Sequence, residues 1–348
     1  MSFETIIMAI LGFCLVMTIV VGLHELGHYL AARKFGIVPA AFAIGFGPEL
    51  TGYTDKHGTR WKINALPVGG YVRFPGPMHP AQYTDDQGER REMAQLPRYK
   101  RAIIVGAGPA INLILTLLIL IGVGVSGRMA AMSTEVESLQ QSSPLAEAGI
   151  KPGNRILSID GKTNDGVLTY MILAQMSDNA NQVFRVEKAS GIQNINVRSV
   201  PQVNPTLRYG VEMVRKSAPS GIYDSTVTGL KISRDMLIIQ AIAVRDIIFK
   251  KDSLNNINGP GTTAKISGEQ LSNGVFTMVL LVALISNAIG FINLLPLPGL
   301  DGGHLAIYAV EAIKGKDIGP KTYATIQTLG LFTIAGMITV GLMNDISG

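Results

Sequence analysis

The sequence predicts a polytopic α-helical membrane protein, with four transmembrane helices and a β-rich domain inserted between the second and the third. Of its 348 residues, 47% are hydrophobic and only 16% are charged, whereas soluble domains carry about a quarter charged residues. Four apolar stretches approach the roughly 20 residues that a helix needs to cross the hydrocarbon core. They are residues 6–23, 102–125, 275–297 and about 325–343.

The first stretch is expected to remain as a membrane span. Glu4 is the only charged residue before it, so it lacks the basic start of a secretory signal peptide, and no small-residue cleavage site follows it. Cys14 lies within it and is the only cysteine of the chain. The sequence therefore excludes an intramolecular disulfide and a cysteine-based metal cluster.

The distribution of basic residues predicts the topology. Residues 33–101 carry 11 Lys and Arg against 6 Asp and Glu, and the segment between the third and fourth spans adds Lys314, Lys316 and Lys321. By the positive-inside rule both segments are cytoplasmic, which places both termini and the middle region outside. The net charge of +5 is not gathered into a basic stripe, so we expect the lipid bilayer, and no nucleic acid, as a partner.

The middle region has a different pattern. Residues 132–213 contain short alternating runs separated by Gly, Pro and Asn, which predicts a small β-rich domain. Residues 230–251 lack Pro and Gly and are helical in composition, but their apolar window, 236–244, is too short to span a bilayer. We expect this helix to lie along the membrane surface or to pack on the β-rich domain.

Two histidines and a glutamate end the first span, in the motif HELGH at His24, Glu25 and His28. Residues four apart share one face of a helix, so the two imidazoles can bind one ion, and Glu25 can take a proton from a water bound to it. Zinc fits this arrangement best. A chance match and a proton relay are alternatives, but each ionisable group in a spanning helix costs at least about 2–3 kcal/mol, which favours a compensating function.

A catalytic zinc site needs a third protein ligand. The candidates that follow the motif have no apolar surroundings: Glu49, Asp55, His57 and His79. Asp301 is instead the only acidic residue in residues 275–310, and it follows the third span on the cytoplasmic side. We therefore expect Asp301 to complete the site, although it lies 273 positions after His28. Asp301 could also be a helix cap. His304 is a rival ligand; its alternative role is that of a polar residue at the start of the next helix.

Together these motifs resemble those of the site-2 protease family of intramembrane zinc metalloproteases, most closely the bacterial regulator-of-sigma-E protease group. The resemblance covers nearly the whole chain. It includes FAIGFGPEL (42–50) and LPVGGYVRF (66–74), which resemble a loop and a membrane-associated β-hairpin, and GAGPAINLIL (106–115) in the second span. Residues 142–162 are similar to the signature of a PDZ domain, and residues 254–260 to the stretch before the third span.

The resemblance implies His24, His28 and Asp301 as zinc ligands and Glu25 as the general base. It also implies that Asn293 contacts the unwound substrate, although an interhelical hydrogen bond of around 1 kcal/mol is an alternative role.

The hairpin residues Gly69, Gly70, Tyr71 and Val72 would form an edge on which a substrate strand pairs; an ordinary hairpin turn is the alternative.

Two further asparagines are expected to be structural: Asn112 and Asn287. Water is expected to enter from the cytoplasmic side, near Lys34 and residues 45–48.

The implied organisation is a first membrane half (1–127), a PDZ-like domain (128–216), a connector (217–270) and a second membrane half (271–348). The implied function is the cleavage of single-pass membrane proteins already shortened by another protease, such as anti-sigma factors or signal-peptide remnants, in the bacterial inner membrane. The PDZ-like domain would act outside, as a size filter or a reader of C-termini, with residues 209–213 as a candidate carboxylate-binding strand. Close relatives usually carry two tandem PDZ domains, whereas this sequence shows one.

Two other functions compete with this one. A catalytically inactive, PDZ-bearing membrane scaffold would not need the intact Glu25. A proton-coupled transporter fits poorly with four spans and a large outer domain.

Overall fold

The computed structural model of this chain describes residues 2–74, 93–128, 130–139, 143–163, 181–198, 211–217, 221–249 and 257–347. The chain forms two compact units, one made of Met1–Thr116 with Ile257–Gly348 and the other of Leu117–Asn256. Within these described ranges, four helices are long and apolar enough to cross a membrane: Phe3–Lys34, Arg98–Val125, Val275–Leu294 and Lys321–Ile346. They lie where the sequence predicts spans, so the chain is a membrane protein with added β elements.

Helix α1 (Phe3–Lys34) is the longest helix described and carries the HELGH motif near its end. Ser2 caps its start by accepting a hydrogen bond from Thr5 N–H at 3.2 Å. Glu4 in the first turn and two basic residues in the last turn complement the helix dipole. Its polar face appears only at its C-terminal end, where the other elements of the unit cover it.

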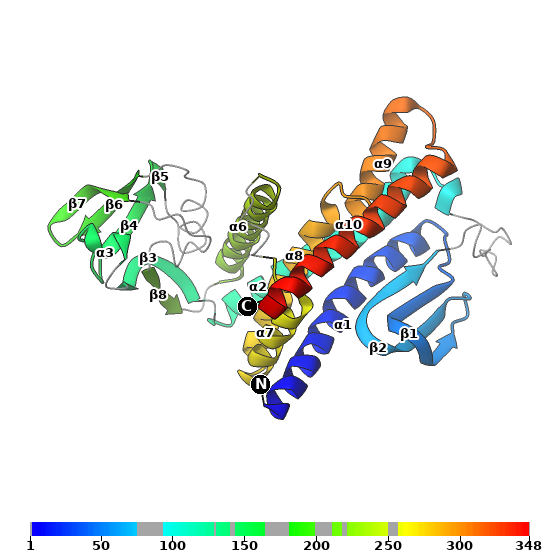
Figure 1. Cartoon of the computed structure of the whole chain (residues 1–348), viewed down its shortest axis with the longest axis horizontal. Coiled ribbons are helices and arrows are strands. Elements are labelled where there is room, and N and C mark those ends of the chain that lie inside the picture. Colours follow the sequence, from blue (N-terminus) through cyan, green and yellow to red (C-terminus); the bar gives the residue numbers. More distant parts are fainter. Residues whose placement is uncertain are drawn as a thin grey trace. The chain divides into compact units, whose positions relative to one another are not determined.

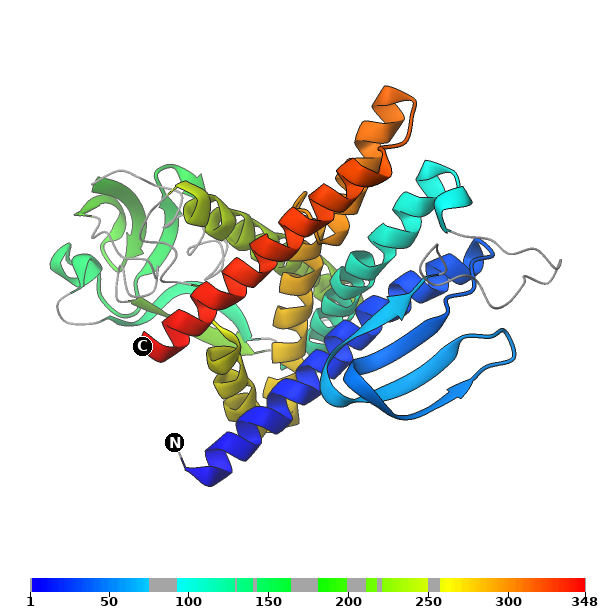
Figure 2. The same cartoon turned by 45° about the vertical axis from the view of Figure 1, so that its right-hand side comes forward.

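Two strands pack against the C-terminal half of α1 (Figures 1 and 2). Residues 41–44 of β1 (Ala41–Thr54) lie beside residues 60–63 of β2 (Arg60–Arg73) in the same direction, and beside residues 70–73 in the opposite direction. Both strands are therefore bent, and β2 folds around β1. Tyr29 of α1 holds this sheet by edge contacts with Phe42 and Trp61, at centroid distances of 6.0 and 5.0 Å.

Two further helices of the first unit pack closely on α1. After η1 (Met93–Gln95), α2 (Arg98–Val125) lies so close to α1 that a Cβ on Gly27 would come within 2.5 Å of Ala107 O. Helix α7 (Pro260–Ser272) approaches α1 in the same way, because a Cβ on Gly12 would come within 2.5 Å of Ser267 O. Glycine at these positions allows the helix backbones to pack closely.

Helix α8 (Val275–Leu294) ends three residues earlier than the predicted span. Leu295 is extended, as expected of a residue that precedes proline, and the segment LPLPG then turns. Gly299 completes the turn with a φ of +87°, which favours glycine. Helix α9 (Asp301–Lys314) begins at once, so Asp301 occupies its first turn next to the end of α8.

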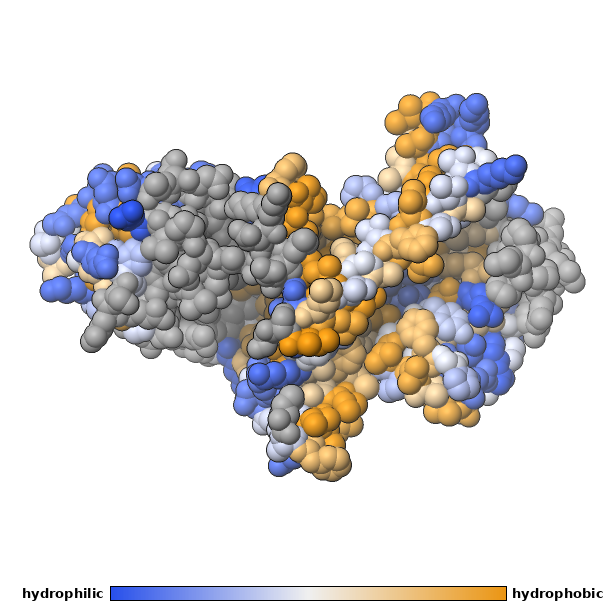
Figure 3. All heavy atoms as spheres, in the orientation of Figure 1, coloured by the Kyte–Doolittle hydropathy of each residue, from blue (hydrophilic) through white to orange (hydrophobic). Residues whose placement is uncertain are grey.

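The last helix, α10 (Pro320–Ser347), has a largely apolar outer surface (Figure 3). Only 11% of its apolar window is buried, as expected of a helix in contact with lipid. Near its end, Asp345 accepts hydrogen bonds from the amides of Gly259, Gly261 and Thr262 at the start of α7, at 2.8–3.2 Å. This carboxylate caps α7 from another helix.

The described residues of the second unit form a six-stranded sheet where the sequence predicts a β-rich domain. Its order is β7-β6-β4-β3-β8, with β5 paired to β4. Its elements are β3 (Ala130–Leu139), α3 (Pro144–Glu147), β4 (Arg155–Ile159), β5 (Lys162–Thr163), β6 (Asn181–Lys188), β7 (Gly191–Arg198) and β8 (Val211–Ser217). Its core includes Leu145, Ile156 and Phe184. Of the candidate carboxylate-binding strand, residues 209 and 210 lie outside the described residues, and residues 211–213 begin β8 at the edge of the sheet.

Helix α6 (Ile222–Phe249) starts eight residues before the predicted helix. It therefore contains Gly229, which directly precedes the predicted range. A Cβ at Gly229 would lie 3.3–3.5 Å from Leu117, Leu120 and Ile121, so the glycine brings α6 close to the end of α2. As predicted, α6 is not among the helices that could span a membrane.

Candidate metal centre

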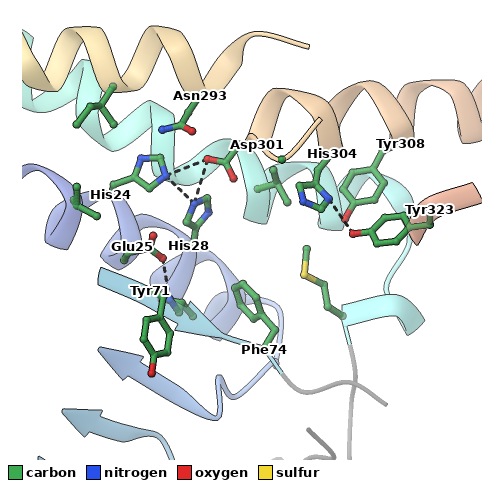
Figure 4. A pocket seen from close by; sticks show the side chains of 16 residues that line it. His24, Glu25, His28, Tyr71, Phe74, Asn293, Asp301, His304, Tyr308 and Tyr323 are labelled. Carbon is green, nitrogen blue, oxygen red and sulfur yellow. Dashed lines mark hydrogen bonds and ion pairs between the residues drawn. The ribbon is translucent and has the colours of Figure 1, made fainter. Parts of the chain in front are cut away.

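Three potential metal ligands converge between α1 and the start of α9. His24 Nε2 and His28 Nε2 lie 3.1 Å apart. Asp301 Oδ2 lies 3.1 Å from the first of these nitrogens and 3.4 Å from the second. Figure 4 shows the three side chains pointing toward one another. The structure thus brings together the three residues that the sequence analysis selected as ligands.

Local geometry explains this convergence. His24 and His28 are one helical turn apart and share a face of α1 that is buried, with 6% and 7% of each residue exposed. Asp301 reaches them because the chain turns sharply after α8. A side chain on Gly302 would clash with the carbonyl oxygens of residues 294 and 295, so only glycine permits the turn to close this tightly.

The hydrogen bonds around the histidines favour a cation between the three ligands. His28 Nδ1 lies 2.9 Å from the carbonyl oxygen of Ile104, which can only accept a hydrogen bond. Nδ1 of a neutral His28 therefore carries the proton, and Nε2 presents a lone pair. Asp301 Oδ2 is buried and has no hydrogen-bond donor of suitable geometry among the described residues. A cation placed here would satisfy the lone pairs of His28 Nε2 and Asp301 Oδ2.

The surroundings also leave room for an ion. A Cβ on Gly108 of α2 would lie 2.5 Å from His28 Cε1 and 2.9 Å from His24 Nε2. A glycine here keeps the space beside the two Nε2 atoms free. Two imidazole nitrogens and one carboxylate oxygen are the donor set of an open catalytic zinc site, so the residues present fit zinc.

Glu25 lies beside the ligands and has one hydrogen-bond partner on β2. Its Oε2 accepts a hydrogen bond from Val72 N–H at 2.9 Å. Ala40 N–H donates to Arg73 O at 2.8 Å, so the polar backbone groups of Arg73 face β1. Those of the adjacent residue, Val72, point to the opposite edge of the strand, toward α1. The edge of β2 that faces away from β1 therefore lies next to the carboxylate of Glu25.

A cavity of about 490 Å³ includes these groups. Asn293 lines it at the end of α8, and Tyr71 and Val72 line it from β2. The other two residues predicted to bind substrate, Gly69 and Gly70, are not among its lining residues. Gly69 has a φ of +85°, and Gly70 lies opposite Ile44 in the sheet.

The cavity continues away from the ligands toward α9 and α10 (Figure 4). Its further lining includes His304, Tyr308 and Tyr323. His304 Nδ1 lies 3.2 Å from the Tyr323 hydroxyl, and within the described part of the chain it does not join the three-residue metal group. Burial lowers the pKa of His304 and raises the pKa of Tyr308 to about 12, so both are neutral near pH 7.

This lining differs from the entry path expected from the sequence. Lys34 and residues 45–48, all of them described, do not line the cavity. Tyr323 does, and it is 36% exposed. The side of the membrane from which water enters stays a prediction.

Comparison with known proteins places these residues in a wider context. Residues 12–337 match the protein family described as "Peptidase family M50". The chain is 34% identical over 360 residues to "Putative zinc metalloprotease Atu1380" of Agrobacterium fabrum, across 97% of this chain and 95% of that protein. It is also 34% identical to "Putative zinc metalloprotease BR1156/BS1330_I1152" of Brucella suis, across 97% and 94%. It is 31% identical to "Metalloprotease MmpA" of Caulobacter vibrioides, across 95% and 94%.

Proposed function

We propose that this chain, a zinc metalloprotease that belongs to peptidase family M50, hydrolyses peptide bonds within the transmembrane segments of single-pass membrane proteins. One observation carries the proposal. The ligand atoms of His24, His28 and Asp301 lie within 4.8 Å of one another, and Glu25 lines the same cavity at the end of an apolar helix long enough to span a membrane.

In the proposed mechanism His24, His28 and Asp301 hold the zinc ion. When bound, zinc supplies Lewis acidity, which activates water and polarises the scissile carbonyl. Glu25 acts as general base: its carboxylate takes the proton of the attacking water and then delivers it to the leaving amide nitrogen. Because Val72 N–H occupies Oε2, Oε1 is the oxygen available for this proton. Asn293 lines the cavity, and its amide would hydrogen-bond the unwound substrate backbone.

The edge of β2 would hold the substrate extended. Residues 66–73 pair with β1 on one side only, and their other edge leads to Glu25. A substrate strand that pairs along Gly69, Gly70, Tyr71 and Val72 would have its peptide bonds exposed beside the general base. A substrate segment can pair in this way only when it is extended. In a helical segment the peptide bond to be cut would be concealed.

The remaining features of the proposal concern location and partners. We place the protein in the bacterial inner membrane, with the active site toward the cytoplasm and both termini and the PDZ-like domain outside. The domain division 1–127, 128–216, 217–270 and 271–348 belongs to this proposal. The substrates would be proteins already shortened by another protease, including anti-sigma factors or signal-peptide remnants.

The experiment compares wild type with Glu25→Gln on a single-pass test substrate reconstituted in vesicles, with zinc content measured on both proteins. We expect wild type to cut within the transmembrane segment, and Glu25→Gln to retain zinc without cutting. Glu49→Gln serves as a matched control, because Glu49 pairs with Arg60 on the sheet and does not line the cavity. Cleavage by Glu25→Gln at the wild-type rate would refute the proposed mechanism.

A further inference from the structure

We infer that Asn112 is a positioning residue of the metal centre, whose side-chain carbonyl fixes the tautomer and orientation of His24. The inference rests on the zinc site proposed above. From the sequence we expected Asn112 to be structural. The structure places its side chain against His24 instead.

Asn112 is held firmly at this place. It is 0% exposed, and its amide Nδ2 lies 3.2 Å from His24 Nδ1. Its backbone carbonyl accepts hydrogen bonds from Thr116 Oγ1 at 3.1 Å and from Ser286 Oγ at 3.0 Å. These contacts fix the backbone between α2 and α8. The side-chain amide therefore has one remaining freedom, a half-turn that exchanges its oxygen and nitrogen.

The metal decides which end of the amide must face His24. His24 Nε2 faces Asp301 and His28, and to bind zinc it must present a lone pair. The ring proton then sits on Nδ1, which needs an acceptor. With Nδ2 toward Nδ1, the proton would be forced onto Nε2, where it blocks the metal. With Oδ1 toward Nδ1, the amide accepts the proton and frees Nε2.

A second observation agrees with the half-turn. Asn112 Oδ1 is buried and has no hydrogen-bond partner among the described residues, and an unpaired buried acceptor is costly. The two ends of a side-chain amide have nearly the same shape, so exchanging them needs no repacking. The exchange gives Oδ1 a donor, the Nδ1–H of His24.

His28 shows the same arrangement with an acceptor that cannot turn. Its Nδ1 lies 2.9 Å from the backbone carbonyl of Ile104, also on α2. Helix α2 thus supplies the partner for both zinc-binding imidazoles, one from its backbone and one from a side chain. Outer-shell partners of this kind orient metal-binding histidines, and their loss typically lowers metal affinity 10–100-fold.

The test measures zinc affinity by chelator competition on purified full-length protein in detergent. Asn112→Leu, which has a similar volume and no acceptor, should bind zinc about 10–100-fold more weakly. Asn112→Asp keeps an acceptor and loses the NH₂ donor, so it should bind zinc at least as tightly as wild type. Ser286→Ala is the matched control: it removes a contact to the same residue without touching His24, and should leave the affinity unchanged. Thermal unfolding of the metal-free proteins reports a purely structural effect.

The outcomes separate this inference from the proposed function. Wild-type affinity in Asn112→Leu overturns the inference, as does an equal loss in folded Asn112→Asp, which would mean that the NH₂ group is what matters. If Asn112→Leu fails to fold, Asn112→Asp alone decides. If wild type itself binds no zinc, the zinc site fails; if wild type binds zinc and cleaves but Asn112→Leu keeps its affinity, only the positioning role fails.

Discussion

Gly108 offers the sharpest test of the space around the ligands. A Cβ at this position would lie 2.5 Å from His28 Cε1 and 2.9 Å from His24 Nε2, and closer still to His28 Nε2. In Gly108→Ala the two rings or α2 must move by about 1 Å to restore ordinary contacts of about 3.5 Å. Zinc sites tolerate distance changes of only about 0.2 Å. We therefore expect zinc affinity to fall by about 100-fold or more, beyond the usual effect of losing an outer-shell partner.

The assay is chelator competition on purified Gly108→Ala, with far-ultraviolet circular dichroism to verify the helices. Gly106→Ala is the matched control, because it lies on the same helix and its Cβ would meet no atom within 4 Å. It should bind zinc like wild type. Equal zinc affinity in Gly108→Ala and Gly106→Ala would refute the reasoning, because the imidazole nitrogens would then not lie against α2 where the structure places them.

Two further predictions concern groups outside the metal centre. Burial raises the pKa of Asp55, but hydrogen bonds from Trp61 Nε1 and the amides of His57 and Thr59 outweigh it and hold the pKa below its ordinary value. The stability that these bonds contribute is then fully present above about pH 3.9 and is lost as the pH falls through the lowered pKa. The fluorescence of Trp61, the only tryptophan, should report this titration. If the same fluorescence change persisted in Asp55→Asn, the assignment to Asp55 would be contradicted. The second prediction concerns Arg101, whose Nη2 lies 3.6 Å from Glu311 Oε2; the Glu311 side chain is only 5% exposed. Arg101→Leu removes a partner of this buried charge. It should therefore lower the unfolding free energy by about 3 kcal/mol. Chemical denaturation measures this loss; no loss relative to the exposed control Lys316→Leu would contradict it, and replacing both Arg101 and Glu311 by leucine should recover much of the stability.

The sequence predicted the long apolar helices and the three side chains that converge in the structure. Apolar runs of sufficient length predicted the four candidate spans, because few other environments accept so many exposed apolar side chains. The spacing of His24 and His28 predicted a shared helix face. Asp301 stood out as a lone acid in an apolar region, and the charge distribution placed it at the same side of the membrane as the histidines.

Other features depend on contacts between distant residues, which local patterns do not encode. Asn112 looked like any polar residue in a span, since its relation to His24 depends on how α1 packs on α2. The double pairing of β1 with both ends of β2 arises from bends in the strands. The cap that Asp345 provides to α7 joins residues more than 80 positions apart, and neither segment alone predicts the other.

The central claim is that His24, His28 and Asp301 hold one zinc ion beside Glu25, and the metal content of four purified proteins tests it most directly. After dialysis against a chelator that wild type withstands, wild type and Glu25→Gln should retain zinc in equal amounts, because Glu25 is not a ligand. His24→Ala and Asp301→Ala should lose it, since each removes one of three ligands. Zinc retained by Asp301→Ala at the wild-type level would contradict the claim.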